Sequence, residues 1–114
     1  MLGNLILNPK EGYNLIAPFY DTWKWQAFWR SNEYPYIERW CHHLTSGFGI
    51  DLGAGSGNNL RCFLESGHRV TAYDISDMML MVCKHKYPEE ISTGQLNCVV
   101  QDICDMNVQF RQYD

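Results

Sequence analysis

Three short apolar segments recur from residue 50 onward, at residues 50–52, 69–74 and 96–101. The last is β-branched at its centre and follows the turn-forming sequence Ser-Thr-Gly at 92–94. Short runs of this kind between turn residues predict buried strands. The segments 59–65 and 77–83 between them have a helical pattern, and Ser76 is placed to cap the second helix. Alternating strands and helices predict an α/β protein with a doubly wound parallel sheet.

The first 45 residues form a different region, which is rich in aromatic side chains. Two helices are predicted there, over residues 13–30 and 33–44. Pro18 is expected to delay or kink the first helix, and Pro35 suits the first turn of the second. Most of the aromatic rings, the tryptophans above all, are expected to pack against the sheet. The aromatic residues are Tyr13, Phe19, Tyr20, Trp23, Trp25, Phe28, Trp29, Tyr34, Tyr36 and Trp40.

A glycine-rich turn joins the first predicted strand to the helix after it. Residues 50–58 read Ile-Asp-Leu-Gly-Ala-Gly-Ser-Gly-Asn. Glycine tolerates a positive φ and lets a ligand approach bare backbone, and the following helix would present unpaired N–H groups. Such a turn can also be only a tight turn. Together with a carboxylate after the next strand, it indicates a nucleotide-containing cofactor.

The spacing of the glycines distinguishes between cofactors. A dinucleotide fingerprint, Gly-x-Gly-x-x-Gly, would require a third glycine at position 58, where this chain has Asn58. An acidic residue, Asp51, precedes the turn, and a carboxylate is poorly placed beside a pyrophosphate but well placed beside a cation. These two features disfavour a nicotinamide-dependent oxidoreductase, although that alternative stays open.

A second carboxylate supports the same interpretation. Asp74 ends the second predicted strand, about twenty residues after the glycine turn, the spacing at which an acid reaches ribose hydroxyls in a doubly wound sheet. A carboxylate accepts two hydrogen bonds at once, which suits a vicinal diol. The alternative is that Asp74 only begins a turn. The third predicted strand also leads into an acid, Asp102, at the same edge of the sheet.

These motifs resemble those of class I S-adenosylmethionine-dependent methyltransferases, which have a Rossmann-like fold. The segment 13–21 also resembles the Tyr-Asp-x-Ile-Ala-x-x-Tyr-Asp lead of small-molecule methyltransferases, with Asn14 as a departure. The resemblance implies that Asp51 helps hold the methionine ammonium, that Asp74 binds the ribose and that Asp102 and Ile103 contact the adenine. It implies aromatic closure over the cofactor. The expected cofactor-binding residues are Asp51, Gly53, Ala54, Gly55, Gly57, Asp74, Ile75, Met79, Asp102, Ile103, Tyr13 and Tyr20.

Composition narrows the remaining possibilities. The 114 residues are 46% hydrophobic and 19% charged, with a net charge of −4, as expected of one soluble domain without a nucleic-acid surface. No run approaches the roughly 20 apolar residues of a membrane span. Five cysteines without a Cys-x-x-Cys pair indicate reduced thiols and a cytoplasmic protein, and no metal site is expected at Cys41-His42-His43. No catalytic residue is assigned; His68 and His85 are expected at the surface.

The resemblance also predicts how much of the fold the chain contains. The family's sheet has the order 3-2-1-4-5-7-6, and residues 110–114 resemble the beginning of its fourth strand. We therefore expect a helical lead or cap over residues 1–45 and a cofactor-binding half-domain over 46–114, truncated at strand 4. The exposed sheet edge would favour self-association or pairing with a complementary fragment. The expected function is methyl transfer to a small-molecule acceptor, with the chain alone inactive; the alternative is a non-catalytic S-adenosylmethionine-binding module or truncated paralogue acting through a partner.

Overall fold

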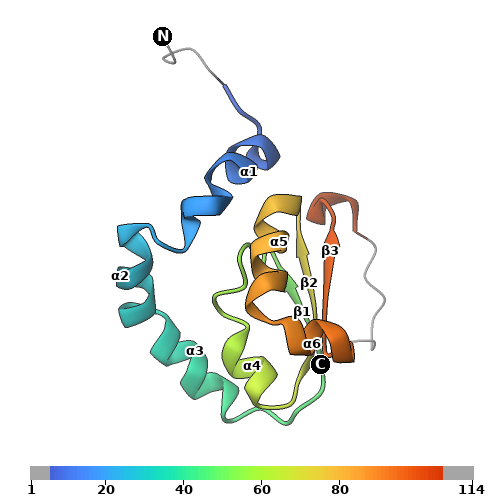
Figure 1. Ribbon diagram of the computed structural model, residues 1–114. Coiled ribbons are helices and arrows are strands. Elements are labelled where there is room, and N and C mark those ends of the chain that lie inside the picture. The colour runs from blue at the N-terminus through green and yellow to red at the C-terminus, as the bar shows by residue number, and fades with distance from the viewer. Residues whose placement is uncertain (1–5, 107–114) are drawn as a thin grey trace.

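The computed structural model describes residues 6–106. Its centre is a parallel three-stranded sheet of β1 (Phe48–Leu52), β2 (Arg69–Asp74) and β3 (Leu96–Val100), in the order β1-β2-β3 (Figure 1). All three predicted strands are present, and the Rossmann-like arrangement is confirmed. In register, Asp51 of β1 lies beside Ala72, and Asp74 of β2 lies beside Val100. The carboxyl ends of the three strands therefore meet at one edge.

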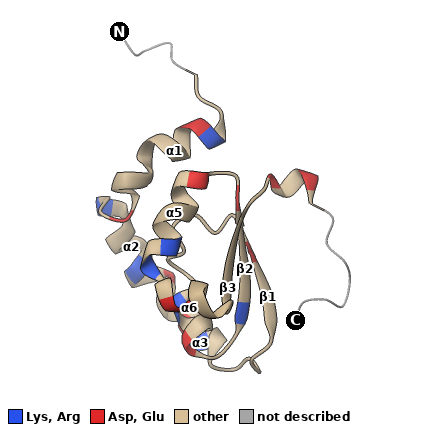
Figure 2. Ribbon diagram, turned by 45° about the vertical axis from the view of Figure 1, so that its right-hand side comes forward, with Lys and Arg blue, Asp and Glu red and all other residues tan. Residues whose placement is uncertain are grey.

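Helices connect the strands and enclose the hydrophobic core. They are α4 (Arg61–Glu65), α5 (Asp77–Lys86) and α6 (Pro88–Thr93), and a 3-10 turn, η1 (Ile103–Asp105), follows β3. Figure 2 shows α5 and α6 packed against one face of the sheet. The core between helices and sheet consists of buried side chains from both layers: Leu60, Leu64, Val70, Ala72, Leu80, Cys83, Tyr87 and Leu96.

In its described residues, the lead consists of three helices: α1 (Pro9–Tyr20), α2 (Lys24–Asn32) and α3 (Tyr34–Cys41). In Figure 1 they arc around residues 46–106, which we call the sheet domain. The single helix predicted over 13–30 was wrong. The first helix starts earlier, because Asn8 and Glu11 form a reciprocal capping box ahead of Pro9. Pro18 lies inside α1, which ends at Tyr20, and the helical structure is interrupted at residues 21–23 before α2 begins.

The second predicted helix of the lead is confirmed as α3, with Pro35 in its first turn. Helix α6 was not expected, because the sequence Ser-Thr-Gly at 92–94 was interpreted as a turn alone. Pro88 begins this short helix, and Gly94 ends it in the left-handed conformation, with φ of 78°.

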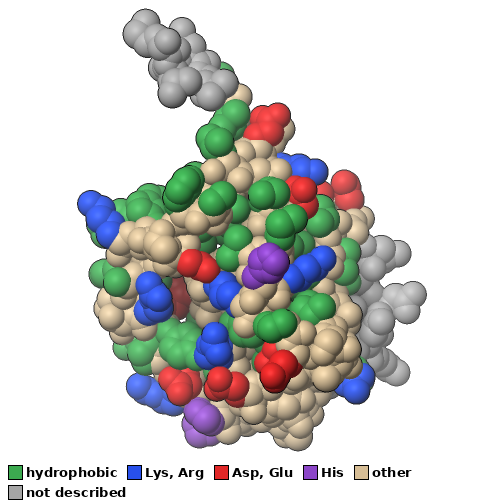
Figure 3. Space-filling model, in the orientation of Figure 1, with side chains coloured by type: hydrophobic (Ala, Val, Ile, Leu, Met, Phe, Trp, Pro, Cys, Tyr) green, Lys and Arg blue, Asp and Glu red, His purple; other side chains and the backbone are tan. Residues whose placement is uncertain are grey.

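Two expectations about burial were also wrong. The tryptophans of the lead are not buried against the sheet: Trp23, Trp25 and Trp29 each expose about half of their surface. Figure 3 shows hydrophobic side chains at the surface over α1 and α2. His68, expected at the surface, is buried, with its Nδ1 3.2 Å from the carbonyl oxygen of Phe63 and its ring edge-on to that phenyl ring. His85 is exposed, as predicted.

Strand β1 pairs only with β2 among residues 6–106, so it forms one edge of the described sheet. This edge position matches the order of strands 1 to 3 expected from the sequence. The expected beginning of a fourth strand, at residues 110–114, lies outside the described part of the chain.

Candidate cofactor site

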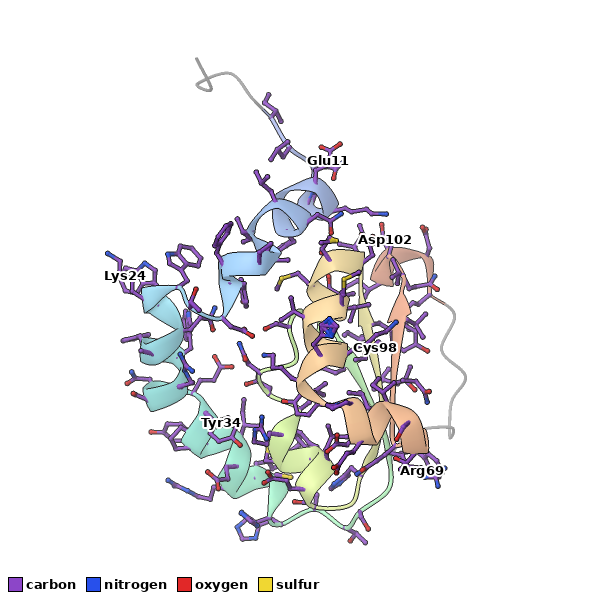
Figure 4. The ribbon with its side chains drawn as sticks, viewed as in Figure 1. Glu11, Lys24, Tyr34, Arg69, Cys98 and Asp102 are labelled. Carbon is purple, nitrogen blue, oxygen red and sulfur yellow. The ribbon has the colours of Figure 1, made fainter. Side chains whose placement is uncertain are left out.

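A cleft of about 960 Å³ lies between the lead and the carboxyl edge of the sheet. This volume is at the upper end of the range typical of small-molecule and cofactor sites. In Figure 4, Asp102 and Tyr34, both of which line the cleft, come from opposite sides of it: the end of β3 and the start of α3. Most of the site residues expected from the sequence lie in its wall: Tyr13, Tyr20, Gly53, Ala54, Gly55, Asp74, Ile75, Met79, Asp102 and Ile103.

The glycines of the turn have two separate roles. Gly53, Gly55 and Gly57 all have positive φ, of 73°, 57° and 79°. At Gly53 a Cβ atom would meet nothing within 4 Å, so bare backbone faces open space. At Gly57 a Cβ atom would lie 2.5 Å from Cys83 Sγ. Gly57 therefore does not line the cleft; it allows the turn to pack closely against α5.

Asp74 organises the turn from the end of β2. Its Oδ2 accepts a hydrogen bond of 2.8 Å from the Gly55 N–H, and its Oδ1 accepts one of 2.8 Å from the Ser76 N–H. The Ser76 side chain in turn caps α5 by accepting from the Met79 N–H. Each carboxylate oxygen keeps a further acceptor position. Asp74 thus fixes the backbone of the turn and can still accept hydrogen bonds from a ligand in the cleft.

Asp51 is not among the residues that line the cleft. It lies near the carboxyl end of β1 and is partly buried. Burial, together with repulsion from the Asp74 carboxylate, raises the pKa of Asp51 to about 6. Two carboxylates close together at one sheet edge give this region a negative potential, which a cationic ligand would relieve. Figure 2 shows acidic residues gathered at this edge.

Asp102 and Ile103 form the rim at the end of β3. Asp102 caps η1 by accepting a hydrogen bond of 2.9 Å from the Cys104 N–H, and Ile103 exposes half of its surface. An apolar side chain and a carboxylate therefore lie side by side at the far end of the cleft. This pair offers one apolar contact and one hydrogen-bond acceptor.

The lead supplies the opposite wall and is anchored at Asn14. The Asn14 amide accepts a hydrogen bond of 2.5 Å from Ser76 Oγ and donates one of 3.0 Å to Asp77 Oδ1. These bonds hold α1 over the start of α5, close to Asp74. Asn14, the residue that departs from the methyltransferase lead pattern, is therefore one of the residues that attach the lead to the sheet domain.

Several cleft residues were not anticipated from the sequence: Gln26, Trp29, Arg30, Glu33, Tyr34, Asn58 and Asn59. A further polar cluster of Asp21, Ser56, Asn58 and Lys86 joins the lead to the glycine turn. The only local signal was Asn58 in place of a glycine. The other partners are 28 or more residues apart in sequence, so no local pattern reveals them.

Among the described residues, no three His, Cys, Asp or Glu side chains form a group that could hold a metal ion. No helix within residues 6–106 has both the length and the apolar character needed to cross a membrane.

Comparison with known proteins agrees with the fold. Residues 50–114 match the family model described as methyltransferase domain. No curated protein sequence matches the chain at a significant level. Among solved structures, the DhpI–SAH complex is 24% identical with a TM-score of 0.73, over 90% of this chain and 47% of that one.

Two further solved structures show the same likeness. A putative S-adenosylmethionine-dependent methyltransferase from Methanococcus maripaludis is 18% identical, with a TM-score of 0.67, over 93% of this chain and 49% of that one. A TehB-like methyltransferase from Corynebacterium glutamicum is 18% identical, with a TM-score of 0.63, over 88% and 52%. The chain thus spans about half the length of these structures.

Proposed function

The chain belongs to the methyltransferase domain family, and from this premise we propose that it is the cofactor-binding part of an S-adenosylmethionine-dependent methyltransferase with a small-molecule acceptor. The glycine turn is the observation that carries the proposal. Bare backbone at Gly53 faces the cleft, and Asp74 holds the neighbouring Gly55 N–H while retaining acceptor capacity.

The residues of the cleft suit each part of this cofactor. Asp74 is placed to accept hydrogen bonds from ribose hydroxyls, and Asp102 and Ile103 offer an acceptor and an apolar surface for adenine. Asp51 contributes negative potential near the ammonium group. The rings of Tyr13 and Tyr20 line the lead side, where an aromatic face attracts a cation. When bound, the cofactor supplies an electrophilic methyl group for transfer to oxygen, nitrogen or carbon.

The chain's own contribution to the reaction is positioning. Methyl transfer depends on holding two reactants in line inside a site that excludes water. The sheet edge would fix the cofactor, and the lead would close over it. We assign no proton transfer to any residue of the chain, and we propose that residues outside it supply most acceptor contacts. The region 1–45 would then act as the cap and 46–114 as the cofactor-binding half.

Calorimetry with S-adenosylhomocysteine tests the proposal. We expect saturable binding of S-adenosylhomocysteine to the full 114-residue chain and no binding of NAD with comparable affinity. Binding of NAD alone would favour the oxidoreductase alternative, since both ligands would be measured on the same sample. Asn58 argues against that alternative, because its side chain hydrogen-bonds Asp21 and Lys86 at the position where the dinucleotide fingerprint has glycine.

A non-catalytic binding module is the second candidate function. It is favoured by the cleft itself, which offers acceptors and bare backbone to a ligand but no residue to which we assign proton transfer. A module would bind S-adenosylhomocysteine but would support methyl transfer only with a partner that completes the sheet beside β1. Transfer of a labelled methyl group by this chain alone, in an acceptor screen, would contradict both the module and the expectation that the chain is inactive by itself.

A further inference from the structure

Four polar side chains from three separate segments meet where the lead contacts the glycine turn. Asp21 is the first residue after α1, Ser56 and Asn58 belong to the glycine turn, and Lys86 is the last residue of α5. We refer to Asp21, Ser56, Asn58 and Lys86 as the latch. None of these residues was singled out as a cofactor-binding residue, and their contacts are not explained by packing alone.

The Asp21 carboxylate is the centre of the latch. Its Oδ1 accepts a hydrogen bond of 2.6 Å from Ser56 Oγ and one of 3.2 Å from Asn58 Nδ2. Its Oδ2 lies 2.8 Å from Lys86 Nζ. One side chain of the lead therefore contacts both the turn and α5.

Lys86 closes the cluster from the other side. Its ammonium donates to Asn58 Oδ1 at 2.7 Å and to Ser56 Oγ at 3.3 Å. Asn58 also donates to Gln26 Oε1 of α2 at 3.3 Å, and Gln26 and Ser56 are both buried. Each member has more than one partner, so displacing one side chain leaves donors or acceptors of the others unpaired.

Two members of the latch, Ser56 and Asn58, line the cleft themselves, and Asp21 adjoins another cleft residue. Asp21 follows Tyr20 directly, at the point where the lead turns from α1 into α2, and Ser56 follows Gly55. Movement of the lead away from the sheet would separate Asp21 from Ser56 and Asn58. The same movement would release the glycine turn from its support on the lead.

We propose that the latch makes the junction of α1 and α2, at residues 21–23, open and close together with the glycine turn. Asp21 and Lys86 then act as positioning residues for cofactor binding. The effect on cofactor binding, the cofactor part, rests on the proposed function. The joint opening of the two segments, the mechanical part, does not. Although burial alone would raise it, hydrogen bonds from Lys86, Ser56 and Asn58 hold the pKa of Asp21 below its usual value. Asp21 is therefore ionised at neutral pH, as its pairing with Lys86 requires.

Hydrogen exchange on the ligand-free chain tests the mechanical part. Lys86→Met removes the ammonium but keeps most of the aliphatic stem. We expect exchange to become roughly tenfold faster in both 19–26 and 54–58, because local opening exposes both segments together. Lys84→Met is the matched control: it lies on the same helix, is exposed and makes no hydrogen bond to the latch, so it should leave both segments unchanged. Faster exchange in only one segment, or in neither, would overturn the proposal.

Calorimetry then measures the link to the cofactor. We expect Asp21→Asn and Lys86→Met each to weaken S-adenosylhomocysteine binding by about fivefold to tenfold, the low end of coupling between sites, because the pair is partly exposed. The double variant should be little worse than either single one. Lys86→Arg, which keeps the charge and donors, should restore the affinity, an effect that a purely structural role would not predict. If the wild-type chain binds no S-adenosylhomocysteine, the proposed function fails, and exchange alone decides on the latch.

Discussion

The lead and the sheet domain are held in place by different kinds of interaction. In the sheet domain, large apolar side chains such as Leu80 and Leu96 are almost fully buried between helices and strands. In the lead, the tryptophans and Phe28 are about half exposed. The buried side chains of the lead are small or polar, such as Ala17, Cys41 and Gln26. Polar groups, chiefly Asn14 and Asp21, help attach the lead to the sheet domain.

This difference has a consequence for how the two regions respond to change. Apolar burial is distributed over many atoms and is lost only when the core is disrupted. A few hydrogen bonds between partly exposed groups contribute about 0.5–1.5 kcal/mol each and can break locally. We therefore expect the sheet domain to determine global stability, whereas the lead determines access to the cleft.

The largest expected effect comes from the core. Leu80 of α5 is 1% exposed and belongs to the main cluster. Leu80→Ala should lower the free energy of unfolding by about 2–5 kcal/mol, because it removes buried methyl groups and leaves a cavity. Urea denaturation followed by circular dichroism measures this loss. A loss below about 1 kcal/mol would mean that the sheet domain does not carry the stability of the chain.

The same contrast explains what the sequence could predict. The three strands and the glycine turn follow local patterns, namely short apolar runs and closely spaced glycines, so their positions were correct. The position of Asp74 beside the turn was also predictable, because strand length fixes its distance from the turn, and it lines the cleft. The break at 21–23 and the latch depend on contacts between residues far apart in sequence, such as Asp21 with Asn58. Composition alone suggested buried tryptophans, yet Trp25 and Trp29 of α2 each expose about half of their surface.

The second prediction concerns the site itself. Asp74→Ala should weaken S-adenosylhomocysteine binding by about 1.5–3 kcal/mol, the contribution of hydrogen bonds to a charged group. The structure adds a second cause, since Asp74 also holds the backbone of Gly55 and Ser76. Titration calorimetry on the folded variant measures the change. Wild-type affinity would rule out Asp74 as a cofactor ligand.

The third prediction uses the titration of Asp51, whose pKa is raised to about 6. If its carboxylate favours the cofactor's ammonium, affinity should rise with pH from 5 to 7, by at most about tenfold per pH unit. The stability of the ligand-free chain should change in the opposite direction as pH rises. Because the folded state binds the Asp51 proton more tightly than the unfolded state, this group's contribution to stability is full below its unfolded pKa and is lost as pH rises through 6.

Asp51→Asn serves as the control for both responses. The amide does not titrate, so the variant should lose this group's share of the pH dependence of affinity and of stability. Calorimetry and urea denaturation at pH 5, 6 and 7 provide the two measurements. If the affinity of the variant depended on pH in the same way as that of the wild type, Asp51 would not act on the ligand.

The smallest expected effect concerns an exposed aromatic side chain of the lead. Trp25 of α2 is 51% exposed, and its neighbours are Phe28, with ring centroids 6.4 Å apart, and Lys24, whose ammonium lies 5.7 Å from the ring. Trp25→Ala should change the free energy of unfolding by no more than about 0.5 kcal/mol, because an exposed ring gives up little burial. Urea denaturation under the conditions used for Leu80→Ala measures it. A loss as large as that of Leu80→Ala would show that the aromatic surface of the lead is part of the stabilising core, and the distinction between the two regions would fail.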